Sequence, residues 1–238
     1  MVPVHAYQAY AYDPPSAQML AVSHGVWRYD IARREWRFPP VNPPFSGNVM
    51  HVSLETTPQG VVAWGEASGK GALFRFNAAT SSFDALPMNG PDIARPWCDG
   101  SGMAYDKTRD ALWLAPGNTL YRYDLATGNL EEINTTPPAI LGGKYALWRE
   151  QVYLPEADLL LLMRRFGPEG AKVNVAYDPT ANKWYSIALP FDDDKEHSFS
   201  WSSALMVDAA SGLVLLHNPI SFWALKLDRQ SAALVELP

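Results

Sequence analysis

Side chains able to bind or react occur at five places along the chain, each near the start of an apolar segment. They are His5; His51; Trp97 with Asp99; Trp148 with Arg149 and Glu150; and His197 with Trp201. Aromatic rings beside hydrogen-bonding groups could bind a small ligand such as a sugar. Three histidines could hold a metal ion, and two carboxylates could act as acid and base in glycoside hydrolysis. Each chemistry requires residues far apart in sequence to converge, so the elements that carry them must be identified first.

A repeat of about 50 residues runs through the chain and identifies those elements. Its clearest copy, YDPTANKWYSIALP from Tyr177, has an aromatic residue, an aspartate, and a second large apolar residue seven positions after the first. The two apolar residues of the five copies are Tyr29 and Trp36, Phe76 and Phe83, Tyr123 and Leu130, Tyr177 and Trp184, and Leu227 and Leu234. This constant spacing predicts five equivalent structural units.

Each unit is predicted to contain four short strands. The aspartate can accept a hydrogen bond from the backbone two residues later, which starts a turn. Second strands such as LLLLM at 159–163 are apolar on both faces, as expected in a sheet covered on both sides. The sequence therefore predicts an all-β fold, a β-propeller of five four-stranded antiparallel blades. The approximate blades are residues 1–40, 47–87, 98–137, 144–190 and 197–238 of a single domain.

This repeat resembles that of kelch-type propellers. Trp36 and Trp184 stand at the place of the family's tryptophan, and the apolar second strand and the aromatic–Asp turn also match. The family's diglycine after the second strand is missing, and only Gly65 in VVAWGEA is similar. The resemblance implies a propeller and no particular ligand, since propellers include enzymes and binding modules alike. Kelch-type rings usually have six or seven blades, so the alternative to a five-bladed ring is a five-blade portion of a larger one.

The first strand of each blade is expected to be innermost, with its start lining one mouth of the central channel. The predicted ligand-binding funnel at this mouth consists of His5, His51, Trp97, Asp99, Trp148, Arg149, Glu150, His197 and Trp201. We expect a non-catalytic binding or interaction module whose partner is a protein or a carbohydrate. The alternative is a carbohydrate-active enzyme of the glycoside hydrolase type that uses Asp99 and Glu150.

No catalytic residue, metal site or cofactor is predicted. The acidic run at 192–194 lacks the ligand spacing of a calcium loop. Cys98 is the only cysteine, which excludes an intramolecular disulfide and a multi-cysteine zinc site. A net charge of −6 without a basic block disfavours nucleic acid as a partner. The chain shows no signal peptide and no apolar run of the ~20 residues that span a membrane, so we expect a soluble protein.

Overall fold

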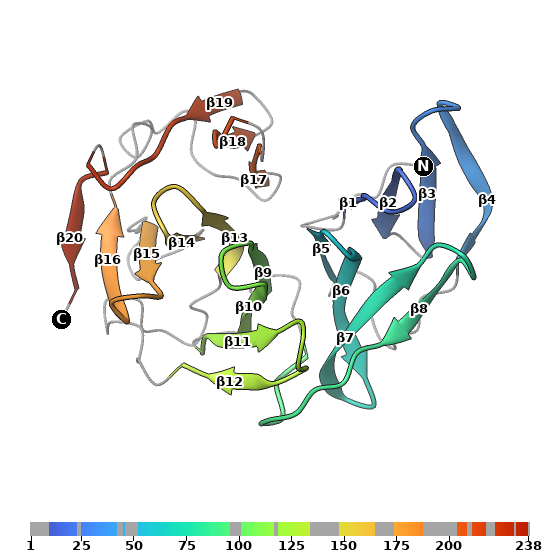
Figure 1. Cartoon of the computed structure of the whole chain (residues 1–238), viewed down its shortest axis with the longest axis horizontal. Coiled ribbons are helices and arrows are strands. Elements are labelled where there is room, and N and C mark those ends of the chain that lie inside the picture. The colour runs from blue at the N-terminus through green and yellow to red at the C-terminus, as the bar shows by residue number, and fades with distance from the viewer. Residues whose placement is uncertain are drawn as a thin grey trace.

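The structure, a computed structural model, consists of β-strands joined by turns. It describes residues 10–22, 25–41, 45, 52–95, 101–116, 119–133, 148–164, 174–187, 204–208, 211–217, 222–230 and 232–237. The described residues contain no helix, and their strands form five blades around a common axis (Figure 1). The predicted all-β propeller of five four-stranded antiparallel blades is confirmed.

The strands fall into five successive sets of four. Blade one contains β1 (Tyr10–Asp13), β2 (Gln18–Val22), β3 (Val26–Asp30) and β4 (Glu35–Val41). Blade two contains β5 (Ser53–Thr57), β6 (Gly60–Ala67), β7 (Lys70–Asn77) and β8 (Ser82–Ala85). Blade three contains β9 (Ser101–Asp106), β10 (Ala111–Pro116), β11 (Tyr121–Asp124) and β12 (Leu130–Glu132). Blade four contains β13 (Trp148–Leu154), β14 (Leu159–Arg164), β15 (Asn174–Asp178) and β16 (Lys183–Ile187). The last set is β17 (Ala204–Val207), β18 (Val214–His217), β19 (Phe222–Leu225) and β20 (Leu234–Glu236).

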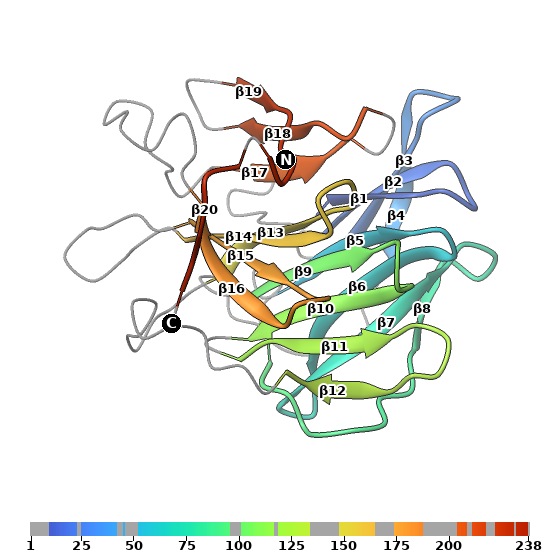
Figure 2. The same cartoon turned by 60° about the vertical axis from the view of Figure 1, so that its left-hand side comes forward.

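Within a blade, consecutive strands pair antiparallel, and the first strand lies nearest the axis (Figures 1 and 2). Strand β20 is placed differently: it pairs antiparallel with β16 of blade four, with Ile187 opposite Leu234. Its Glu236 also forms an ion pair of 2.8 Å with Lys183. The last strand of the fifth set therefore ties the end of the chain to blade four.

Aspartates shape the turns as the repeat predicts. In blade four, the carboxylate of Asp178 accepts the backbone N–H groups of Thr180 and Ala181 at 2.9 and 2.8 Å. The turn ends at Asn182, whose φ of 54° lies in the left-handed region that asparagine tolerates well. Tyr177 and Trp184 of the same repeat are only 2% and 4% exposed. The motif thus builds a tight turn between two strands that are buried by neighbouring blades.

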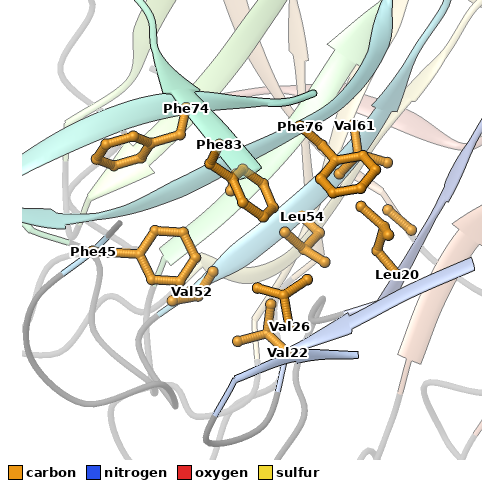
Figure 3. Packing of buried hydrophobic residues seen from close by; sticks show 12 residues of the cluster. Leu20, Val22, Val26, Phe45, Val52, Leu54, Val61, Phe74, Phe76 and Phe83 are labelled. Atoms are coloured by element: carbon orange, nitrogen blue, oxygen red, sulfur yellow. The ribbon is translucent and has the colours of Figure 1, made fainter. Parts of the chain in front are cut away.

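Four apolar clusters hold neighbouring blades together, one at each junction along the chain. Between blades one and two, Leu20, Val22 and Val26 pack against Val52, Leu54 and the three phenylalanines of blade two (Figure 3). Phe45 joins this cluster, with edge-to-face contacts to Phe74 and Phe83. The strands of blades two, three and four are apolar on both faces because each of these blades packs against two others.

Candidate functional site

The starts of the innermost strands define one end of the propeller, named here the entry end. Strands β9 and β13 run parallel there, and Trp148 pairs directly with Ser101. Two predicted site residues, Trp97 and Asp99, precede Ser101 by four and two positions in the sequence. The first strands of blades three and four therefore begin side by side at the entry end.

The structure describes the backbone position of three of the nine predicted funnel residues. Trp148, Arg149 and Glu150 open β13, the first strand of blade four. The other six lie outside the described residues: His5, His51, Trp97, Asp99, His197 and Trp201. The prediction that all nine form one funnel stays a prediction. Within the described ranges, no group of three or more His, Cys, Asp and Glu side chains could hold a metal ion.

A β-bulge interrupts β13 where the predicted residues lie. Trp148 pairs with Arg164 and Glu150 pairs with Met163, so β13 carries one extra residue, Arg149, relative to β14. The first and second strands of the other four blades pair without a register shift in their described residues. Bulges redirect the strand and its side chains, and they are enriched beside active sites and at barrel rims. The entry end of blade four therefore departs from the repeat where the predicted site lies.

The opposite end of the propeller, named the turn end, carries the turns between first and second strands. The carboxylate of Asp13 accepts the N–H of Ser16 at 3.1 Å and that of Val61, in blade two, at 3.0 Å. Asp106 accepts the N–H groups of Thr108 and Arg109, and it is fully buried. These carboxylates complete turns and join blades, which is a structural role.

Arg109 is the centre of a polar network between blades three and four at the turn end. Its guanidinium binds both carboxylate oxygens of Asp158, at 2.7 and 2.9 Å, and one oxygen of Asp106 at 2.9 Å. The hydroxyl of Tyr153 donates to Asp158 at 2.7 Å. Arg109 holds the pKa of Asp158 well below its usual range, and burial raises the pKa of Tyr153. Asp158 therefore stays ionised and cannot serve as a general acid near neutral pH.

Blade five joins the same end of the molecule through Arg229. Its guanidinium forms an ion pair with Asp178 at 2.7 Å and donates to the carbonyl oxygen of Ala157 at 2.5 Å. Burial acts to raise the pKa of Asp178, but the hydrogen bond and charge of Arg229 together with the N–H groups of Ala181 and Thr180 outweigh burial, and the pKa is lowered. The charged groups of this network are bound to one another across three blades, which explains why they can be buried.

Glu55 is the titratable residue that the sequence reasoning missed. It lies on β5, the first strand of blade two, and burial raises its pKa to about 8, although N–H groups of Tyr105 and Thr56 partly oppose the shift. The strand registers make it equivalent to Ala104 and Val152 in blades three and four. An acidic residue at a position that is apolar in the other four blades was the available signal. Glu55 lies at the level of Tyr105, roughly 13 Å along β9 from Ser101, so it is away from the entry end.

A cleft of about 250 Å³ lies between blades three and four. Buried Trp113 and Tyr177 are among its lining residues, and their rings meet edge to face at 5.6 Å. Arg122 also lines it and pairs with Glu131 at 3.2 Å, both in blade three. The lining cations Arg109 and Arg122 are thus paired with carboxylates, so they offer little free charge to an anionic ligand.

A basic residue recurs at one position of the third strand in the first three blades, as Arg28, Arg75 and Arg122. Arg28 of blade one donates to the hydroxyl of Ser81 in the next turn of blade two. Arg122 pairs within its own blade. These contacts favour a structural role over a ring of basic charge that binds an anion.

Comparison with known proteins shows the fold alone. No protein-family model and no curated protein matches the chain. Solved structures do: an auxiliary nutrient binding protein from Bacteroides ovatus shares 13% identity at a TM-score of 0.56, over 92% of this chain and 57% of that one. The GH74 xyloglucanase from Xanthomonas campestris shares 16% identity at a TM-score of 0.54, over 91% of this chain and 36% of that one. TolB from Acinetobacter baumannii shares 10% identity at a TM-score of 0.51, over 95% and 51%.

The chain spans about half of TolB and a smaller part of the xyloglucanase. At such identities the likeness extends to the path of the backbone and not to a ligand or a reaction. None of the described elements is a helix long and apolar enough to cross a membrane.

Proposed function

We propose that this chain is a non-catalytic binding module of the kelch-like propeller type, with a carbohydrate or a protein segment bound at the entry end. The observation that carries the proposal is the bulge at Arg149, on an innermost strand and next to the paired starts of β9 and β13. The first and second strands of the other four blades pair regularly in their described residues, so a four-stranded blade does not require such an irregularity. A binding site that needs redirected side chains explains it.

The contrast between the two ends supports the same assignment. At the turn end, Asp106, Asp158 and Asp178 are bound to turn N–H groups or to guanidinium groups of neighbouring blades. Carboxylates whose hydrogen bonds are already made within the protein bind a ligand weakly, because the existing hydrogen bonds and ion pairs would have to be broken first. The aromatic, basic and acidic residues predicted to lie at the entry end, by comparison, do not belong to the repeated sequence motif.

The second candidate function is glycoside hydrolysis, since Glu150 lies on β13, whose start pairs with Ser101, and Asp99 stands two positions before Ser101 in the sequence. Hydrolysis of a glycosidic bond needs at least an acid and a second carboxylate. Glu55 has the raised pKa of a general acid but lies roughly 13 Å from the entry end along β9. We therefore rank binding above hydrolysis.

A thermal-shift screen with sugars, polysaccharides and peptides tests the proposal, because a ligand that binds only the folded state raises the melting temperature. A ligand at 100 times its Kd adds about 2.7 kcal/mol, which corresponds to roughly 5–10 °C for a domain of this size. We expect Arg149→Ala to reduce this shift and the matched Arg33→Ala, in an exposed turn of blade one, to leave it unchanged. A shift that survives Arg149→Ala, Trp148→Ala and Glu150→Gln would place the ligand elsewhere. Release of reducing sugar, abolished by Glu150→Gln, would establish the hydrolase instead.

A further inference from the structure

The cleft between blades three and four lies at a place that the repeat defines at each junction between consecutive blades. Its walls include Arg122, on the third strand of blade three, and Asn182, in the turn between the third and fourth strands of blade four. Arg122 comes one residue before Tyr123, and Asn182 comes five residues after Tyr177. Because these are fixed positions of the repeat, their equivalents can be compared at the other junctions.

At the junction of blades one and two, a direct hydrogen bond joins the two equivalent residues. Arg28 of blade one donates to the hydroxyl of Ser81 in blade two. Ser81 has a φ of 53° and Asn182 a φ of 54°, so both stand at the left-handed position that ends the turn. Serine offers an oxygen atom to the arginine, and this contact closes the junction at that place.

The junction of blades two and three is closed by the chain segment that follows β8. The residue equivalent to Asn182 is Gly128, and a Cβ atom there would lie 2.9 Å from the carbonyl oxygen of Pro87. Glycine at this position therefore lets the segment pass. Tyr123 donates its hydroxyl to the carbonyl oxygen of Pro87 at 2.9 Å, and the N–H of Asn89 donates to the carbonyl oxygen of Gly128 at 2.8 Å.

The junction of blades four and five is closed by apolar packing. Ala176 stands at the position of the arginine and Ala232 at the position of Asn182. Both alanines belong to the apolar cluster between these two blades. In the described residues, the place is thus filled at three junctions, by a hydrogen bond, by a chain segment and by apolar side chains.

Blades three and four leave the same place open. The Oδ1 atom of Asn182 accepts the hydroxyl of Tyr177 at 2.7 Å, a bond that the carbonyl oxygen of Pro87 receives at the preceding junction. The Nδ2 group of Asn182 is a donor, and so is the guanidinium of Arg122, so the two walls cannot bond to each other. Arg122 pairs instead with Glu131 of its own blade at 3.2 Å. The cleft of about 250 Å³ remains.

We propose that this cleft binds a single neutral sugar unit, whatever the entry end binds. The two donors on opposite walls, Asn182 and Arg122, suit a ligand that presents acceptor oxygens, and the carboxylate of Glu131 suits a hydroxyl that donates. A sugar offers both on neighbouring carbon atoms, since every hydroxyl can donate and accept. A trans peptide group points its N–H and C=O in opposite directions, so it cannot serve adjacent Arg122 and Glu131 at once.

The charge and the size of the cleft agree with this ligand. The lining cations Arg109 and Arg122 are both paired with carboxylates, so the walls have no excess positive charge for an anion. Ile133 and Pro179 add apolar lining for the C–H groups of a sugar ring. The volume is below the roughly 300–1,000 Å³ of pockets for drug-sized ligands, so the occupant is small. We expect a Kd on the order of 1–10 mM.

Saturation-transfer NMR with the methyl glycosides of glucose, galactose, mannose and xylose tests the proposal, because this method detects weak binding. Arg122→Met and Asn182→Gly each remove one donor, and glycine readily adopts the left-handed conformation at position 182. The pair of Arg122 and Glu131 is largely exposed and contributes little to stability, so Arg122→Met should remain folded. We expect each substitution to weaken binding of the best methyl glycoside about three- to tenfold, which corresponds to one hydrogen bond.

Arg28→Met is the matched control, because Arg28 has the same repeat position at a closed junction. It should leave the Kd within about twofold of the native value. The proposal is overturned if no methyl glycoside binds the native chain, or if the Kd is unchanged in both cleft variants. Binding that is weakened by Arg149→Ala and not by Arg122→Met would place the sugar at the entry end and overturn it as well. A short peptide that binds and loses affinity with Asn182→Gly, while no glycoside binds, would assign the cleft to a peptide instead.

Discussion

Replacing Arg109 with methionine removes the guanidinium that joins blades three and four at the turn end. Asp158 loses two hydrogen bonds of 2.7 and 2.9 Å, and fully buried Asp106 loses one of 2.9 Å. Removing one partner from a buried ion pair destabilises a protein by about 3–5 kcal/mol, because the remaining charge is left uncompensated. Arg109 and Asp158 are 21% and 30% exposed, so water compensates in part. We therefore expect a loss of about 3 kcal/mol, or roughly 6–12 °C in melting temperature.

Urea unfolding followed by tryptophan fluorescence measures this loss, and a double-mutant cycle isolates the pair. Arg109→Met, Asp158→Asn and the double variant should give a coupling energy of at least about 1 kcal/mol. The matched control is Arg33→Met, whose 64% exposed side chain lies 3.9 Å from Glu35 and should contribute less than about 0.5 kcal/mol. If Arg109→Met is no more destabilising than Arg33→Met, the reasoning about the buried pair is refuted.

The pH dependence of the same variant gives an independent check. The folded-state pKa of Asp158 is lowered, so its stabilising effect is complete above the ordinary aspartate value of about 4. The effect is lost as the pH falls below that value toward the folded-state pKa. The difference in stability between the native chain and Arg109→Met should therefore be constant from pH 6 to 8 and shrink below about pH 4. A difference that is the same at pH 3 and pH 7 would assign the loss to packing of the arginine side chain instead.

Three further predictions use single substitutions. The raised folded-state pKa of Glu55, about 8 against an ordinary 4.5, means that native stability falls as the pH rises between these values and is flat above them. Glu55→Gln should remove that slope, which is at most about 1.4 kcal/mol per pH unit. Urea titrations at several pH values measure the stability of the native chain and of Glu55→Gln, and parallel pH profiles would contradict the prediction. Gly90→Ala would place a methyl carbon 2.1 Å from the carbonyl oxygen of Leu130, and should destabilise by about 1–3 kcal/mol; an unchanged urea midpoint would contradict this. Trp184→Ala, at a site only 4% exposed, should cost about 3–5 kcal/mol, whereas Ile31→Ala at an exposed turn should cost less than about 0.5 kcal/mol.

The repeat predicted the blade correctly because its signals are local. Asp178 starts a turn through N–H groups two and three residues away, and Tyr177 and Trp184 pair directly across the hairpin. Interactions within ten residues depend mainly on spacing and side-chain type, and both can be read from the sequence. The resulting hairpin carries Tyr177 and Trp184 into the apolar cluster between blades three and four.

Contacts between blades could not be predicted in the same way. Arg109 and Asp158 are 49 residues apart, and their meeting depends on how two complete blades stack. Trp36 and Trp184 have the same place in the repeat, yet one is 47% and the other 4% exposed. Likewise β20 has the sequence of a fourth strand of blade five but pairs with β16. Of the candidate site, the sequence supplied Trp148, Arg149 and Glu150, whereas the bulge at Arg149 arises from a pairing with Met163 and Arg164 that no local pattern specifies.

The two ends of the propeller differ because of the repeat itself. In blade four the motif's aspartate, Asp178, begins a turn at the turn end and also receives Arg229 of blade five. At the same end, Asp13 receives a backbone N–H of blade two, and Asp158 receives Arg109 of blade three. A substitution at the turn end would break these contacts and destabilise the fold, so few substitutions there could create a binding site. The entry end carries the turns between second and third strands, such as the one between Ala67 and Lys70, and the paired starts of β9 and β13. Loops and strand starts outside the repeated motif are where a common scaffold can carry a specific binding site.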